Sequence, residues 1–285
     1  MAAPLPAGKD SGVRRPSPVT LPGDPVTLVT VDGVRLAAWH TPPGDSADPT
    51  LGVVLLHGFT GSLRRPAVQA VAQGLSAHAG VLLVDQRGHG DSGGVSTLGD
   101  LEVLDVDAAI GAARRLGYAR VVTQGWSMGG SSVLRQAALA AGADGGRARG
   151  WPVRETPDAV VSVSAASRWG IRDTSPMRRL HWVVEKPLGR RVGRLLGVRI
   201  DPIGWQDRWP ISPSEAAQAL SVPLLVVHGD RDGYFTLEHP RALAAAAGQR
   251  AELWEVEGFG HAEKAADAHL VDRIGAHLAA LVGAT

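Results

Sequence analysis

Six short aliphatic runs between residues 51 and 256 constrain the fold more than any other feature of this sequence. They are LGVVLL (51–56), VLLVD (81–85), RVVTQ (120–124), AVVSVS (159–164), PLLVVH (223–228) and AELWEV (251–256). Their apolar character is continuous, which is typical of parallel strands that helices cover on both faces. Segments with helical spacing lie between the runs, for example at Leu101 and Leu104, and after the last run, at Leu270 and Ile274. The alternation predicts an α/β fold with a mostly parallel, doubly wound sheet.

The N-terminal part follows a different pattern. Residues 1–25 contain many Pro, Gly and Ala residues and no apolar periodicity, so we expect a flexible tail without chemistry, followed by one domain over 26–285. Two β-rich runs flank Asp32-Gly33, a pair that suits a tight turn, and predict an antiparallel hairpin. The chain shows no signal peptide and no apolar run long enough to span a membrane, so we expect a cytoplasmic protein.

The segment 168–210 interrupts the alternation and predicts a helical lid inserted over the sheet. Residues 168–208 contain ten basic and four acidic residues, and the whole segment includes Trp169, Trp182, Trp205 and Trp209. Three interpretations remain open: a solvated face whose aromatic residues pack on the core, the wall of an acyl pocket, or a surface that rests on lipid. The first is favoured, and contact with a membrane surface is not. Trp126, Trp169 and Trp182 are candidate substrate-binding residues.

The pattern G-x-S-x-G, which can surround a nucleophilic serine, occurs twice, at Gly125–Gly129 and at Gly90–Gly94. Ser127 follows the run RVVTQ directly and precedes a helix-compatible segment, so a sharp strand-to-helix turn would expose its hydroxyl beside the positive end of a helix. Ser92 lies in a glycine-rich loop, where a serine usually bonds to nearby backbone. We therefore predict Ser127 as the nucleophile.

A serine nucleophile requires a base, and the base requires an orienting acid. His261 lies in a glycine-flanked loop between the last strand and the last helix, from which an imidazole can reach the nucleophile, whereas His57 and His228 are expected to be structural. Asp232 is the favoured acid because it lies beyond the turn that follows PLLVVH, with Asp230 as the alternative. The N–H groups of Met128 and Phe59 are predicted to form the oxyanion hole.

Composition excludes several other kinds of chemistry. The absence of cysteine excludes disulfides, thiolate metal sites and a cysteine nucleophile. A net charge of +1 gives no global electrostatic basis for binding nucleic acid. No histidine–carboxylate spacing suggests zinc, and no G-x-G-x-x-G follows the first buried strand, so we expect neither a metal nor a cofactor.

Together these motifs resemble the α/β-hydrolase superfamily over residues 26–285. The resemblance rests on HGFTG (57–61), DQRGHGDSGG (85–94), GWSMGG (125–130), HGDRD (228–232) and GFGH (258–261), and on the chain order Ser127, Asp232, His261. It implies the α/β-hydrolase fold, oxyanion donors at Phe59 and Met128, a structural role for residues 85–94 and a lid at 168–210. The esterase, lipase and serine-peptidase branches share these features.

The expected function is that of a serine hydrolase that cleaves a carboxylic ester, or a related acyl bond, of a small-molecule substrate through an acyl-enzyme intermediate. An acyltransferase, or a serine peptidase or amidase, with the same triad is the alternative. A cofactor-free perhydrolase and a non-catalytic binding protein are weaker alternatives. The sequence does not identify the substrate or the oligomeric state.

Overall fold

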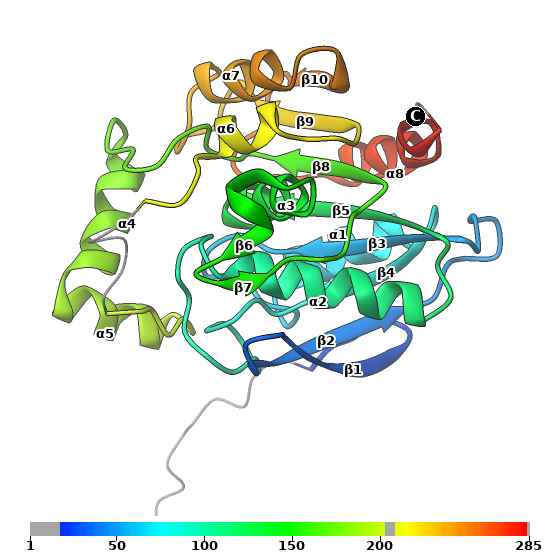
Figure 1. Ribbon diagram of the computed structural model, residues 1–285, viewed down its shortest axis with the longest axis horizontal. Coiled ribbons are helices and arrows are strands. Elements are labelled where there is room, and N and C mark those ends of the chain that lie inside the picture. Colours follow the sequence, from blue (N-terminus) through cyan, green and yellow to red (C-terminus); the bar gives the residue numbers. More distant parts are fainter. Residues whose placement is uncertain (1–17, 203–208, 284–285) are drawn as a thin grey trace, which may run out of the picture.

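The computed structural model describes residues 18–202 and 209–283, and an eight-stranded sheet forms its centre (Figure 1). The strand order is β1-β2-β4-β3-β5-β8-β9-β10. β2 pairs antiparallel with β1 and with β4, and the remaining pairs are parallel. The strands are β1 (Asp24–Val29), β2 (Arg35–Thr41), β3 (Leu51–Leu56), β4 (Gly80–Val84), β5 (Arg120–Trp126), β8 (Ala159–Val163), β9 (Leu224–Gly229) and β10 (Ala251–Val256). This topology confirms the predicted fold, including the antiparallel hairpin.

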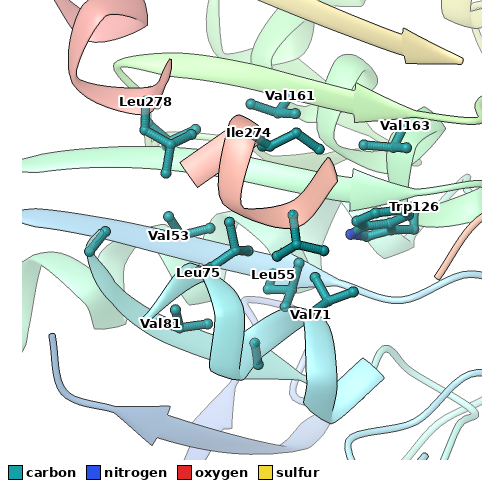
Figure 2. Packing of buried hydrophobic residues seen from close by; sticks show 14 of the residues in the cluster. Val53, Leu55, Val71, Leu75, Val81, Trp126, Val161, Val163, Ile274 and Leu278 are labelled. Carbon is teal, nitrogen blue, oxygen red and sulfur yellow. The ribbon is translucent and has the colours of Figure 1, made fainter. Parts of the chain in front are cut away.

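Helices cover both faces of the sheet. One face packs against α1 (Pro66–Leu75) and α8 (Ala268–Val282), and the other against α2 (Glu102–Arg115), α3 (Met128–Ala140), α6 (Pro213–Gln218) and α7 (Glu238–Ala247). Figure 2 shows the first layer, in which Ile274 and Leu278 of α8 lie over Val161 and Val163 of β8. The two apolar layers fix the sheet, so the carboxyl ends of its parallel strands form a rigid edge.

Two details, in β10 and in the N-terminal tail, differ from the sequence predictions, and the structure of segment 141–150 was not predicted. β10 is an edge strand in which only Trp254 is buried, so this run is not covered on both faces. The glycine-rich segment 141–150 contains a short 3₁₀-helix, η1 (Ala143–Gly146), and β6 (Arg147–Ala148), which pairs with β7 (Trp151–Pro152). The expected tail is ordered from residue 18 onward, because Leu21 is buried in the core and Thr20 donates to Gln69. Residues 1–17 lie outside the described part.

The predicted lid consists of two helices, α4 (Ser175–Glu185) and α5 (Pro187–Leu195), which project from the body of the molecule (Figure 1). Met177 and Phe235 belong to one apolar cluster, which joins α4 to the loop after β9. After α5 the chain forms β-bridges from Val198 to His89 and from Ile200 to Ser96. Both ends of the helical pair are therefore attached to the domain. Within 18–202 and 209–283, no helix is long and apolar enough to cross a membrane.

Candidate active site

Ser127 occupies a strained turn between β5 and α3. Its φ of 53° and ψ of −113° lie in a region that costs a non-glycine residue of order 1–3 kcal/mol. The turn is held by the Ser127 N–H, which donates to the carbonyl of Val163 at 2.8 Å. Glycine is required on both sides, because a Cβ on Gly125 would lie 2.1 Å from the carbonyl oxygen of Gly129 and one on Gly129 would lie 2.7 Å from that of Leu56. The surrounding backbone thus fixes the hydroxyl at the carboxyl edge of the sheet.

Two of the three residues predicted to form a triad, Ser127 and Asp232, each lie within hydrogen-bonding distance of the third, His261. Nε2 of His261 lies 3.0 Å from Oγ of Ser127, and Nδ1 lies 2.7 Å from Oδ2 of Asp232. With Nδ1–H donating to the carboxylate, Nε2 is left to accept the proton of the serine hydroxyl. Three segments that are distant in sequence thereby form one continuous relay of hydrogen bonds.

The side chain of Asp232 is buried, yet several groups stabilise its ionised form. Burial raises the pKa of Asp232, but the hydrogen bond and charge of His261, the N–H of Phe235 and nearby His228 outweigh burial and hold this pKa below its ordinary value. Oδ1 accepts hydrogen bonds from the N–H groups of Tyr234 at 2.7 Å and Phe235 at 3.1 Å. The carboxylate is therefore fixed in orientation and negatively charged at neutral pH.

Two aromatic residues that follow Asp232 hold the His261 ring. Tyr234 stacks on the imidazole with a centroid distance of 4.1 Å and an interplanar angle of 25°, and Phe235 meets it edge-on at 5.6 Å. The sequence analysis missed both residues. The only signal for them was their position directly after Asp232, because a loop that carries the acid to the histidine must also pass close to the histidine.

The predicted oxyanion donors, Phe59 and Met128, both border the cavity beside Ser127. Among the described residues, neither backbone N–H donates to another group. Gly58, which precedes Phe59, donates its N–H to Oε1 of Glu263 at 2.5 Å. Glu263 is a further residue that the sequence analysis missed. It lies two residues beyond His261, so its carboxyl group ties the His261 loop to the Gly58–Phe59 loop.

The serine, aspartate and histidine residues that the sequence did not favour for the triad have other hydrogen-bond partners. Ser92 is buried, accepts from the N–H of Ala37 at 2.9 Å and donates to the carbonyl of Asp85. Asp230 accepts from the N–H of Gly258 at 2.7 Å. His228 is buried and its Nε2 lies 3.1 Å from the carbonyl of Phe235. His57 is also buried, with Nδ1 bonded to the carbonyl of Gly58. Each of these contacts holds a loop in place.

A cavity of about 650 Å³ opens beside Ser127 and is bounded on its far side by the lid. Its apolar lining consists of Phe59, Leu98, Met128, Ala166, Trp169, Ile171, Met177, Leu180, Val184, Trp209 and Phe235. Charged side chains line it as well, at Arg168, Arg172, Glu185, Lys186, Arg190 and Asp201. A space of this size holds a small organic molecule.

Only one of the three predicted substrate-binding tryptophans borders this cavity. Trp169 lines it and donates its indole N–H to the carbonyl of Pro210 at 3.0 Å. Trp126 was predicted incorrectly, because it is fully buried and its ring points into the α1–α8 layer (Figure 2). Trp182 does not line the cavity either, and 44% of its surface is exposed. Trp209, which was not among the three, does line the cavity.

The described residues contain no group of three or more His, Asp or Glu side chains that could hold a metal ion. The polar groups at the serine are instead those of a hydrogen-bond relay.

Sequence comparisons assign the chain to a known family. Residues 53–144 match the family described as alpha/beta hydrolase fold. The chain is 31% identical over 233 residues to a monoacylglycerol lipase from Mycolicibacterium smegmatis, a match that covers 75% of this chain and 80% of the lipase. The chain therefore belongs to the α/β-hydrolase family.

Further comparisons agree with the fold. An esterase structure from Pyrococcus furiosus superposes with a TM-score of 0.69 at 22% identity, over 98% of this chain and 97% of the esterase. A shorter match, 34% identical over 108 residues, is to the dihydrolipoyllysine-residue acetyltransferase component of the acetoin cleaving system of Pseudomonas putida and covers 38% of this chain and 28% of that protein. Fold and family thus confirm the resemblance seen in the motifs.

The turn at Ser127 predicts a large effect for the substitution Gly125→Ala. Its new Cβ would collide with backbone at Gly129, which no side-chain rotation can relieve, so we expect a loss of about 3 kcal/mol in the free energy of unfolding. Gly233→Ala is the control, because no atom lies within 4 Å of a Cβ there, and it should change stability by less than about 0.5 kcal/mol. Urea denaturation measures both. Equal midpoints for the two variants would contradict this account of the turn.

The Glu263–Gly58 contact predicts different effects for two substitutions. Glu263→Ala leaves a buried N–H without an acceptor and should cost about 1–3 kcal/mol, whereas Glu263→Gln keeps an acceptor oxygen and should cost less. Burial raises the pKa of Glu263 above its ordinary 4.5. As the pH rises, the Glu263 carboxyl therefore loses its proton in the unfolded chain before it does so in the folded protein. The contribution of Glu263 to the free energy of unfolding consequently falls above pH 4.5. In urea denaturation at several pH values, the free energy of unfolding of Glu263→Gln should rise relative to that of the wild type as the pH increases. A difference that stays constant with pH would contradict the raised pKa of Glu263.

Proposed function

We propose that this chain hydrolyses carboxylic esters with Ser127 as the nucleophile, His261 as the general base and Asp232 as the orienting acid. The observation that carries the proposal is the chain of hydrogen bonds from the Ser127 hydroxyl through the imidazole to a carboxylate with a lowered pKa. The family supports the same conclusion, because the relatives described above are named as a lipase and an esterase.

In the proposed reaction, Nε2 of His261 accepts the hydroxyl proton as Oγ of Ser127 attacks the ester carbonyl. The tetrahedral intermediate collapses when the imidazolium returns the proton to the leaving alcohol, which leaves an acyl-enzyme. Water then repeats the sequence and releases the acid. Asp232 holds the imidazole in the required tautomer and stabilises its positive charge, and the stack with Tyr234 keeps the ring in the plane that the transfer needs.

The N–H groups of Phe59 and Met128 are proposed to bind the oxyanion. Both border the cavity beside Ser127, and that of Met128 begins α3, where the helix dipole favours negative charge. Removal of one such donor typically costs about 3–4 kcal/mol of transition-state stabilisation. Because its neighbour Gly58 is fixed by Glu263, the Phe59 N–H is oriented before the substrate binds.

The lining of the cavity favours an apolar acyl or alkyl group next to the scissile ester. Leu180, Val184 and Met177 of α4 line it together with Phe235 and Leu98. Burial of such a chain is worth about 0.8 kcal/mol per methylene group. We therefore expect kcat/KM for p-nitrophenyl esters to rise with acyl length until the cavity is filled.

Acyl transfer is the second candidate, because the chain also matches part of an acetyltransferase component. The same acyl-enzyme would then react with an alcohol or amine in place of water. Product analysis with and without such an acceptor separates the two, since a transferase would form the new ester or amide in preference to the free acid.

Replacement of the nucleophile tests the proposal directly. Ser127→Ala should lower kcat for a short p-nitrophenyl ester by about 10⁴-fold or more and abolish labelling by a fluorophosphonate. Ser92→Ala, at the competing motif, should keep its labelling even though it loses two buried hydrogen bonds. If labelling survived Ser127→Ala and disappeared with Ser92→Ala, the assignment of Ser127 as the nucleophile would be wrong.

The acid is tested by a matched pair of substitutions. Asp232→Asn should reduce kcat by on the order of 10³–10⁴-fold, because an amide can hold the imidazole in the wrong tautomer. Asp230→Asn keeps an acceptor for the Gly258 N–H and should leave kcat within about threefold of wild type. Steady-state kinetics on folded protein, checked by circular dichroism, decides the matter. A larger loss at 230 than at 232 would reverse the assignment.

A further inference from the structure

α5 packs against the rest of the lid through a glycine face. A Cβ on Gly189 would lie 2.2 Å from the carbonyl oxygen of Trp182, and one on Gly193 would lie 2.9 Å from Cδ1 of Ile200. Four-residue spacing places both glycines on one side of the helix. Because this side is in contact with the lid, the opposite side of α5 must face outward.

Leucine occupies that outward side. Leu188 is 61% exposed and Leu195 is 87% exposed, and the neighbouring Leu196 and Trp182 are also exposed. Arg191 lies three residues after Leu188 and four before Leu195, so the three side chains form one stripe along the helix. Large exposed apolar side chains that gather on one element mark an interaction surface.

The charge around this stripe is positive and unneutralised. Arg179, Lys186, Arg191 and Arg194 are exposed, and none has a carboxylate partner among residues 18–202 and 209–283. The carboxylates of residues 168–202 form ion pairs with other arginine residues.

Each of the three acidic residues in the described stretch 168–202 has a basic partner. Asp173 pairs with Arg168, Glu185 with Arg172, and Asp201 with Arg149. The exposed basic groups around the leucines thus lack an internal counter-charge in the described lid.

We propose that the outer surface of the lid, formed by Trp182, Leu188, Arg191, Arg194 and Leu195, docks on an anionic lipid bilayer. Leucine and tryptophan enter the interfacial region, and the arginines meet the lipid phosphates. A second copy of this chain fits the surface less well, because a two-fold contact would place the arginines of one copy against those of the other.

The docking surface and one wall of the cavity lie on the same two helices, α4 and α5. Lys186 joins α4 to α5 and also lines the cavity together with Arg190, while Leu180 and Val184 line it from α4. A lid that rests on a bilayer would place the wall of the cavity beside the lipid. The docking itself does not depend on the proposed catalytic roles, so Ser127→Ala should bind vesicles as the wild type does.

Vesicle co-sedimentation tests the proposal. The full chain should sediment with vesicles of phosphatidylcholine and phosphatidylglycerol at low salt, less at high salt, and much less with phosphatidylcholine alone. Combined Arg191→Glu and Arg194→Glu should weaken binding at least about tenfold. Combined Leu188→Ser and Leu195→Ser should do the same and, because both side chains are exposed, leave the melting temperature unchanged.

Matched controls lie on the body of the domain. Leu116→Ser, at the end of α2, and Arg250→Glu, in the 3₁₀-helix η2 (Gly248–Arg250), change an exposed leucine and an exposed arginine and should leave vesicle binding unaltered. Failure of the wild type to bind anionic vesicles, or equal binding by lid and control variants, overturns the proposal. A wild-type dimer in size-exclusion chromatography that the leucine variant converts to a monomer, with no vesicle binding, assigns the surface to self-association instead.

Discussion

The turn at Ser127 is the constraint on which the rest of the site depends. A residue with positive φ at the end of β5 exposes its hydroxyl only if α3 starts at once and passes very close to the strand. That approach leaves no room for a side chain at Gly125 or Gly129. The strain is balanced by the two apolar layers that hold the strand in the middle of the sheet. The Ser127 hydroxyl is therefore positioned by the packing of the whole domain.

The loops around this turn add the other groups, and they do so under strain of their own. Ser164 and Ala262 also have positive φ, and Ala262 follows His261 directly while Ser164 follows Val163, whose carbonyl accepts from the Ser127 N–H. Such residues gather at functional sites because the surrounding structure must hold them there. Ala262, for example, is fixed through its N–H, which donates to Oγ of Ser164 at 3.2 Å.

Much of this arrangement could be predicted from sequence, because short-range patterns determine it. The aliphatic runs marked the strands, and Asp32-Gly33 marked the connection between the antiparallel strands β1 and β2. What failed was the direction of side chains and contacts across long distances. Trp126 sits within a catalytic-type motif, but its strand position turns it into the core. The Glu263–Gly58 bond joins groups 205 residues apart and leaves no local pattern.

The two attachments of the lid have a consequence for how substrates enter. Met177 fixes α4 to the loop after β9, while Val198 and Ile200 join the chain after α5 to the segment that follows β4. Because the lid is attached at both ends, it cannot rotate open about a single hinge without breaking one of these two attachments. Entry then depends on bending of the span between them, so bulky, rigid molecules would be admitted more slowly than slender, flexible ones of equal volume.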